Sequence, residues 1–103
     1  MKRFPKRHKY KAVPKIADGF WFASTKEADY YIELKIRLRA DVLFFTRQVP
    51  FHLPNNVILR VDFQVFYKDG SHEFIDVKGF TTPEYKAKKR MVEALYPIII
   101  REV

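Results

Sequence analysis

The chain has 103 residues, of which 48% are hydrophobic and 17% aromatic, and a formal net charge of +8. This length suits one domain, and the apolar fraction is too high for a disordered basic protein. The lack of cysteine excludes disulfides and thiolate metal sites, and no apolar run approaches the roughly 20 residues of a membrane span. We therefore expect a soluble cytoplasmic protein with a polyanionic partner and no membrane association.

The first 15 residues form a basic segment without any acidic residue. Phe4, His8 and Tyr10 lie between its charges and could stack on bases or sugars, which favours a flexible arm that binds nucleic acid. A solubilising tail, or a contact with acidic lipid, is the alternative. The domain itself is expected over residues 16–103. The basic residues of the arm are Lys2, Arg3, Lys6, Arg7, Lys9, Lys11 and Lys15.

The segment "DGFWFAS" predicts a turn and a short strand, with Trp21 in the core, and "STKE" after it predicts the start of a helix. Ser24 can cap this helix while the Glu27 side chain reaches back to the Ser24 amide, as in a capping box. The helix is expected over about residues 25–39. Its apolar face carries one acid, so capping and a functional role both remain open for Glu27. That face consists of Glu27, Tyr31, Leu34 and Leu38.

Three strands are expected next. The run "VLFFTRQVPFHL" indicates extended chain, with Pro50 suited to a sheet edge, and "PNN" indicates a turn. The run "VILRVDFQVFY" alternates in polarity, as a strand with one buried face does. "KDG" then turns the chain into "SHEFIDVKG", the third strand.

A second helix and a last strand complete the layout. "TTPEYKAKKRMVEAL" predicts a helix with Thr82 as N-cap and Pro83 in its first turn, and "PIIIREV" predicts a short strand. The order is helix, three strands, helix, strand, which indicates an α/β domain. On the second helix we expect Lys86, Lys89 and Arg90 on one side, and Tyr85, Val92 and Leu95 toward the core.

The loop between the second and third strands decides whether their two aspartates meet. A two-residue turn would put Asp62 opposite Val77 and mix charge with hydrocarbon on both faces. A three-residue loop with Gly70 in the left-handed conformation puts Asp62 opposite Asp76 and Phe63 opposite Ile75. We predict the three-residue loop, because it separates polar from apolar side chains.

Two carboxylates directly across a strand pair repel each other, so a positive charge is needed between them. Arg60 and Lys78, expected to pair, could supply it, which would make the site an ordinary charged cluster on a solvated face. A divalent cation is the other solution, since Mg²⁺ binds one or two carboxylates and completes its shell with water and phosphate. The Val77 carbonyl could add an oxygen, and Lys78 could then orient or activate a water molecule.

These residues resemble the PD-(D/E)XK nuclease superfamily, whose core is a helix, three strands, a helix and a strand. The family signature is an acid on the first helix, an Asp on the second strand and an acid-x-Lys on the third, and it falls on Glu27, Asp62, Asp76 and Lys78. The likeness covers roughly residues 17–103 and extends to a small phage-encoded branch.

Two positions depart from or extend the family pattern. Val61 stands where the superfamily's name expects Pro, and Asp76 is a permitted variant of the more usual Glu. Neither difference removes a ligand oxygen. Gln48, in "RQVPF", matches a Gln sometimes seen near such sites, although an ordinary polar strand residue explains it equally well.

The resemblance implies a restriction-endonuclease-like fold, with a mixed central sheet flanked by helices, and a Mg²⁺-dependent DNA endonuclease that Mn²⁺ could also serve. The implied catalytic residues are Glu27, Asp62, Asp76 and Lys78, and the implied metal ligands are Glu27, Asp62, Asp76 and the Val77 carbonyl. The implied DNA contacts are Lys2, Arg3, Lys6, Arg7, Lys9, Lys11, Gln48, Lys86, Lys89 and Arg90.

The short chain has no added module for reading bases, which favours an enzyme specific for junctions, flaps or other branched DNA over a restriction enzyme. Such an enzyme would act in phage-type replication or recombination, in the cytoplasm of a bacterial host, and a homodimer would fit junction cleavage by analogy. The alternatives are a non-catalytic DNA-binding module on a nuclease-like fold and an accessory protein of a replication or packaging machine.

Overall fold

The computed structural model describes residues 15–103, so the basic residues from Lys2 to Lys11 lie outside the described part. Lys15, the last residue of the expected arm, is the first residue of a strand. The elements in chain order are β1 (Lys15–Ala17), β2 (Phe20–Phe22), α1 (Thr25–Arg37), β3 (Val42–Leu53), the 3₁₀ turn η1 (Pro54–Asn56), β4 (Val57–Tyr67), β5 (His72–Asp76), α2 (Pro83–Leu95) and β6 (Ile100–Glu102).

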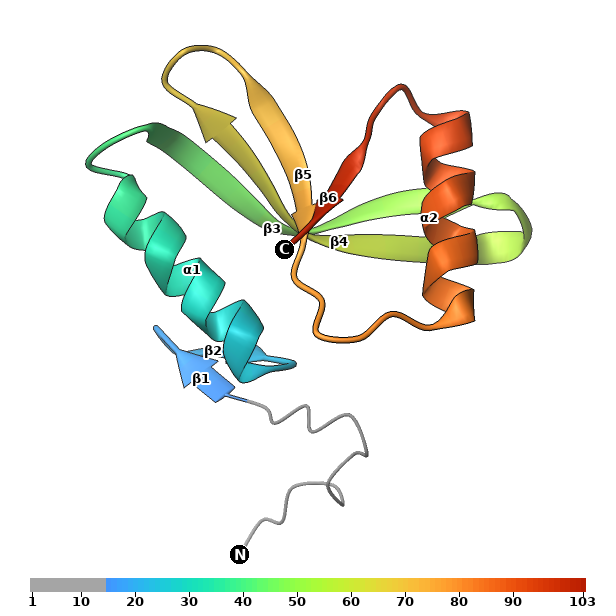
Figure 1. Ribbon diagram of the computed structural model, residues 1–103, viewed down its shortest axis with the longest axis horizontal. Helices are drawn as coiled ribbons and strands as arrows, with labels where there is room; N and C mark the ends of the chain where they lie inside the picture. The colour runs from blue at the N-terminus through green and yellow to red at the C-terminus, as the bar shows by residue number, and fades with distance from the viewer. Residues whose placement is uncertain (1–14) are drawn as a thin grey trace, which may run out of the picture.

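The main sheet is mixed and has the strand order β3-β4-β5-β6. Strand β4 is antiparallel to both β3 and β5, and β6 runs parallel to β5 after the crossover through α2. Strands β1 and β2 form a separate hairpin beside α1 (Figure 1). The predicted order of helix, three strands, helix and strand is therefore confirmed, as a single α/β domain with a mixed sheet. Pro50 lies on the edge strand β3, as expected.

Both helices begin at the predicted caps. The Ser24 Oγ accepts the Glu27 N–H at 3.1 Å, and the Thr82 Oγ1 accepts the Tyr85 N–H at 3.1 Å. These bonds satisfy amides that have no partner within the helix. Pro83 occupies the first turn of α2, where its missing N–H costs nothing. The caps thereby fix where Glu27 and Tyr85 stand relative to the sheet.

The loop that joins β4 to β5 has the predicted form, with Lys68, Asp69 and Gly70 between the bonded residues Tyr67 and Ser71. The Tyr67 N–H donates to the Ser71 carbonyl at 2.8 Å, and Gly70 has a φ of +93°, a left-handed value that favours glycine. Phe63 consequently lies opposite Ile75. This register brings Asp62 and Asp76 to adjacent positions on neighbouring strands.

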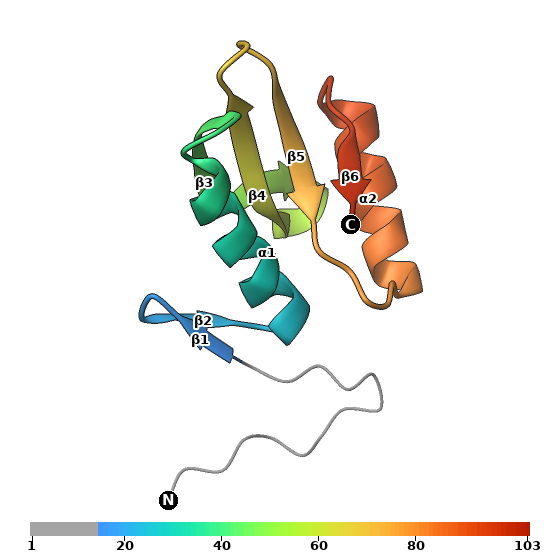
Figure 2. The same ribbon diagram turned by 60° about the vertical axis from the view of Figure 1, so that its left-hand side comes forward.

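The core has two clusters, and the long hairpin of β3 and β4 contributes to both. Val57, Leu59 and Val61 pack in the cluster that contains Val92 of α2, whereas Phe63 and Val65 pack in the cluster that contains Leu34 of α1. The two helices accordingly lie on opposite sides of the strands (Figure 1; Figure 2). The change from one cluster to the other falls at Asp62 on β4.

Two residues expected in the core are exposed. Trp21 is 54% exposed, because it lies opposite the exposed Ile16 on the small β1–β2 hairpin and not on the main sheet. Leu95 is 58% exposed, because it is the last residue of α2, where the chain turns away toward β6. The stripe on α1 is confirmed, since Tyr31 and Leu34 are buried together with Glu27. Within residues 15–103, no helix is both long and apolar enough to cross a membrane.

Candidate functional site

The two aspartates meet where the ladder between β4 and β5 stops. Beyond the pair of Phe63 and Ile75, side chains replace the backbone bonds: the Asp62 N–H donates to the Asp76 Oδ1 at 2.8 Å, and the Val77 N–H donates to the Asp62 Oδ2 at 2.9 Å. Each carboxylate is thus bonded to the backbone of the other strand. The two acids are neighbours, as predicted, and each is fixed by a directional bond.

The predicted pairing of Arg60 with Lys78 is wrong. Strand β5 ends at Asp76, so Lys78 has no partner on β4, and Arg60 lies exposed opposite Pro50 of β3. The physical reason is the insertion of the carboxylates between the strands, which takes the place of further ladder bonds. Arg60 therefore does not compensate the charge of the aspartates by this route.

Gln48 joins the third acid to this pair. Its Nε2 donates to the Glu27 Oε2 and to the Asp62 Oδ1, each at 3.3 Å. Gln48 has a φ of +53°, a left-handed conformation that costs a residue with a side chain about 1–3 kcal/mol and that often marks functional sites. The strained backbone of β3 holds one amide between two carboxylates from α1 and β4.

The Glu27 side chain lies at this site, while the Ser24 side chain caps the helix. The carboxylate of Glu27 is bonded to the Gln48 side chain and to the backbone of Ala23. It is only 6% exposed, although it stands in the first turn of α1. The sequence left capping and function open, and the contacts of the side chain favour a role in the site.

The acids are buried and mutually repulsive. Asp62 is 9% exposed and Asp76 is fully buried. Burial, and then the charge of Asp62, raises the pKa of Glu27 to about 7, against smaller opposing effects of Arg47 and Lys78. Burial also raises the pKa of Asp62, and the charge of Asp76 adds to it, although the bond from the Val77 amide opposes the shift. A positive charge at this place would relieve both effects.

Lys78 and Tyr85 complete the cluster. The Lys78 Nζ lies 4.2 Å from the centroid of the Tyr85 ring, and the Tyr85 hydroxyl donates to the Asp76 Oδ2 at 2.7 Å. The Lys26 Nζ donates to the Lys78 carbonyl at 2.8 Å. Tyr85 and Lys26 were not predicted from the sequence as members of the site. A tyrosine in the first helical turn after the acid-x-Lys strand is the signal that could have indicated Tyr85.

Part of this cluster lines a pocket of about 440 Å³, while Tyr85 and Gln48 lie outside its lining. Glu27 and Asp62 are its acidic lining residues, Lys26 and Lys78 its basic ones, and Asp76 lies next to Asp62 outside the lining. Across residues 15–103, no three acidic or histidine residues form a ready-made metal-binding group. The lining is Ala23, Ser24, Thr25, Lys26, Glu27, Asp62, Val77, Lys78, Gly79, Phe80 and Thr82.

The basic residues expected on α2 differ in their surroundings. Lys86 and Arg90 are exposed, whereas Lys89 is partly buried and forms an ion pair with Glu102 at 2.8 Å. Lys86 and Arg90 therefore have charges directed to solvent, and the charge of Lys89 is already matched.

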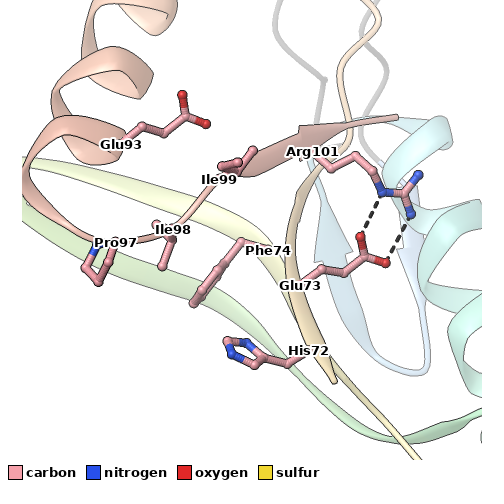
Figure 3. A pocket seen from close by; sticks show the side chains of 8 residues that line it. All are labelled: His72, Glu73, Phe74, Glu93, Pro97, Ile98, Ile99 and Arg101. Carbon is pink, nitrogen blue, oxygen red and sulfur yellow. Dashed lines mark hydrogen bonds and ion pairs between the residues drawn. The ribbon is translucent and has the colours of Figure 1, made fainter. Parts of the chain in front are cut away.

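A second hollow, of about 620 Å³, lies between β5 and the segment that joins α2 to β6 (Figure 3). Its charged groups have partners: Arg101 forms two hydrogen bonds with Glu73, at 2.9 and 3.2 Å, and the Glu93 carboxylate accepts the Ile100 N–H at 2.7 Å. Phe74 and Ile99 make up part of its apolar wall. Both carboxylates of this hollow, Glu73 and Glu93, thus accept hydrogen bonds from donors in the same hollow or next to it.

The fold and the pocket together define a small α/β protein with buried acids beside a lysine. A family model described as a protein of unknown function (DUF1064) matches residues 7–102, and the chain belongs to this family. No curated protein matches the chain.

Proposed function

We propose that the protein is a metal-dependent DNA endonuclease with a restriction-endonuclease-like fold of the PD-(D/E)XK kind. The observation that carries this proposal is the convergence of Glu27, Asp62 and Lys78 on one pocket, with Asp76 bonded directly to Asp62. The acid on the first helix, the Asp of the second main strand and the acid-x-Lys segment thus lie at one site, which supports the proposal.

The residues of the pocket fit a hard divalent cation such as Mg²⁺, or Mn²⁺ in its place. Glu27 and Asp62 offer carboxylate oxygens, and Val77 offers a backbone carbonyl. Burial, and then the charge of Asp62, raises the pKa of Glu27 to about 7, and a bound cation would offset both effects. Asp76 is the third proposed carboxylate ligand. Its two hydrogen bonds leave lone pairs free, because a carboxylate has about four acceptor sites. When bound, the metal would lower the pKa of a water molecule and offset charge on the phosphate.

We assign the remaining residues of the site to phosphate binding, to orientation of the carboxylates and to DNA binding. Lys78 would stand beside the attacked phosphate, and the Gln48 amide would keep the two carboxylates it bridges in one arrangement. Lys86 and Arg90, with the basic residues from Lys2 to Lys11, would bind the DNA backbone. We propose branched DNA, such as junctions or flaps, as the substrate.

The test is cleavage of supercoiled plasmid and of a four-way junction with Mg²⁺, with Mn²⁺ and with a chelator. We expect cleavage that needs metal and that is lost in Asp62→Asn and in Asp76→Asn. Asp29→Asn is the matched control, since Asp29 is an exposed aspartate on α1 that pairs with Lys15. Wild-type protein that binds DNA but never cuts it would refute the proposal.

A non-catalytic DNA-binding module is the second candidate. It is favoured by the finding that no three potential ligands within residues 15–103 stand ready to hold a metal. For such a module, the same assay gives binding without cleavage, and Asp62→Asn leaves that binding unchanged.

A further inference from the structure

Tyr85 stands at a fixed position next to the acid-x-Lys segment. It lies in the first turn of α2, where the Thr82 side chain accepts its backbone N–H. The connection from β5 leads directly into this turn, as Figure 2 shows. Tyr85 is therefore attached to the site both through the chain and through a helix cap.

The hydroxyl of Tyr85 completes the surroundings of Asp76. This carboxylate is fully buried, and its Oδ1 already accepts the Asp62 N–H. The Tyr85 hydroxyl supplies a donor to the other oxygen, Oδ2, at 2.7 Å. A buried carboxylate with a donor on each oxygen has one preferred orientation, because any rotation would break a bond that water cannot replace.

The ring of Tyr85 holds the Lys78 ammonium. The Nζ lies 4.2 Å from the ring centroid, well within the range of a cation–π contact. The backbone of Lys78 is held as well, since its N–H donates to the Val103 carbonyl at 3.0 Å and its carbonyl accepts from Lys26. What remains free is the flexible four-carbon side chain, and the ring restricts that.

We propose that Tyr85 is the positioning residue of the acid-x-Lys pair, with its hydroxyl orienting Asp76 and its ring placing Lys78 at the pocket. This inference rests on the proposed function. Partners that orient a metal-binding carboxylate commonly change metal affinity or activity about 10- to 100-fold when removed. Because Tyr85 contacts the groups that act on the scissile phosphate, its loss should lower kcat and leave KM for DNA nearly unchanged.

The experiment compares Tyr85→Phe, which keeps the ring, with Tyr85→Leu, which removes ring and hydroxyl. Tyr96→Phe is the matched control, because the Tyr96 hydroxyl donates to the His52 carbonyl at 2.9 Å and not to a carboxylate of the site. We expect about tenfold lower kcat and about tenfold weaker Mn²⁺ binding for Tyr85→Phe, a further drop in kcat for Tyr85→Leu, and no change in either quantity for Tyr96→Phe.

A second readout needs neither DNA nor metal. In NMR spectra, the protons of the Lys78 side chain should be shifted upfield by the Tyr85 ring relative to those of Lys26. The shift should persist in Tyr85→Phe and disappear in Tyr85→Leu. Wild-type protein whose Lys78 resonances match those of Lys26 would overturn the placing of Lys78 by the ring, even if Tyr85→Leu does not fold.

The outcomes separate this inference from the proposed function. A wild-type protein without metal-dependent cleavage overturns the nuclease proposal, while the NMR shift still tests the contact with Lys78. A wild-type protein that cleaves, with Tyr85→Phe equal to Tyr96→Phe in kcat and in Mn²⁺ affinity, overturns the positioning role of the hydroxyl alone.

Discussion

The two hollows of the domain differ in how their charges are compensated. At the acidic pocket, Gln48 bridges Glu27 and Asp62, and burial, together with the charge of a neighbouring carboxylate, raises the pKa of both acids. In the hollow of Figure 3, Arg101 pairs with Glu73, and the pKa of Glu73 is lowered because its bonds with Arg101 and Tyr67 outweigh burial. A folded chain has no structural need to bury like charges together, so the first hollow, although smaller, is the better candidate for function.

The largest expected effect contrasts metal binding at the two hollows. Asp62→Asn removes a charged ligand but keeps an oxygen that can accept the Val77 N–H, so the variant should fold. We expect Mn²⁺ affinity, measured by calorimetry, to fall at least ~100-fold, or about 3 kcal/mol. Glu93→Gln in the other hollow should leave the affinity unchanged. Equal Mn²⁺ affinities in the two variants would show that the acidic pocket does not bind metal in preference to the other hollow.

The second largest effect is expected from Glu27, whose buried carboxyl makes the stability of the fold depend on pH. Because folding raises the pKa of Glu27 from 4.5 to about 7, the folded state binds the proton more tightly, and stability declines as pH rises between these two values. Glu27→Gln removes this loss. We expect its free energy of unfolding, from urea titration, to exceed that of the wild type by about 3 kcal/mol at pH 8 and to equal it at pH 4. A variant less stable than the wild type at pH 8 would contradict the burial of an uncompensated charge.

Because Gln48 has a left-handed backbone conformation, we expect a glycine variant at this position to be more stable than an alanine variant. Gln48→Gly and Gln48→Ala both remove the bridging amide, but glycine adopts the left-handed φ of +53° without steric cost. Gln48→Gly should therefore be more stable than Gln48→Ala by about 1 kcal/mol in thermal unfolding. At Thr46, an exposed position on the same strand without a positive φ, the order should reverse.

The smallest effect is expected at the paired charges. The folded pKa of Glu73 is lowered, so its stabilising contribution is complete above the unfolded pKa and is lost as pH falls through the folded one. Arg101→Met should destabilise the protein by about 0.5 kcal/mol at pH 7, because the Arg101 side chain is half exposed. Urea titrations at low and high salt should show this difference shrinking with salt. A difference that salt does not change would argue against an ion pair.

Local rules predicted the features that depend on local sequence. The caps at Ser24 and Thr82, and the loop with Gly70, follow from turn chemistry and from the separation of polar and apolar faces. That separation also placed Asp62 beside Asp76, which is the geometric part of the candidate site.

The features that escaped prediction depend on contacts between distant segments. The left-handed Gln48 arises where β3 meets α1 and β4, and no residue type signals it. The prediction that Arg60 pairs with Lys78 is wrong because, beyond Ile75, carboxylates take the place of backbone carbonyls as the acceptors between the strands. The contact of Tyr85 with Asp76 required the position of α2 over the end of β5, which alternation along a strand cannot give.

The long β3–β4 hairpin also has a consequence for cooperativity. Because Val61 lies under α2 and Phe63 under α1, one continuous strand anchors both halves of the core, and Asp62 stands between them. Neither half can open without disturbing that strand, so slow amide hydrogen exchange should disappear from both halves together. A packing defect introduced beneath α2 would reach the acidic pocket through the backbone that joins Val61 to Asp62, so a substitution far from the pocket could still displace its carboxylates.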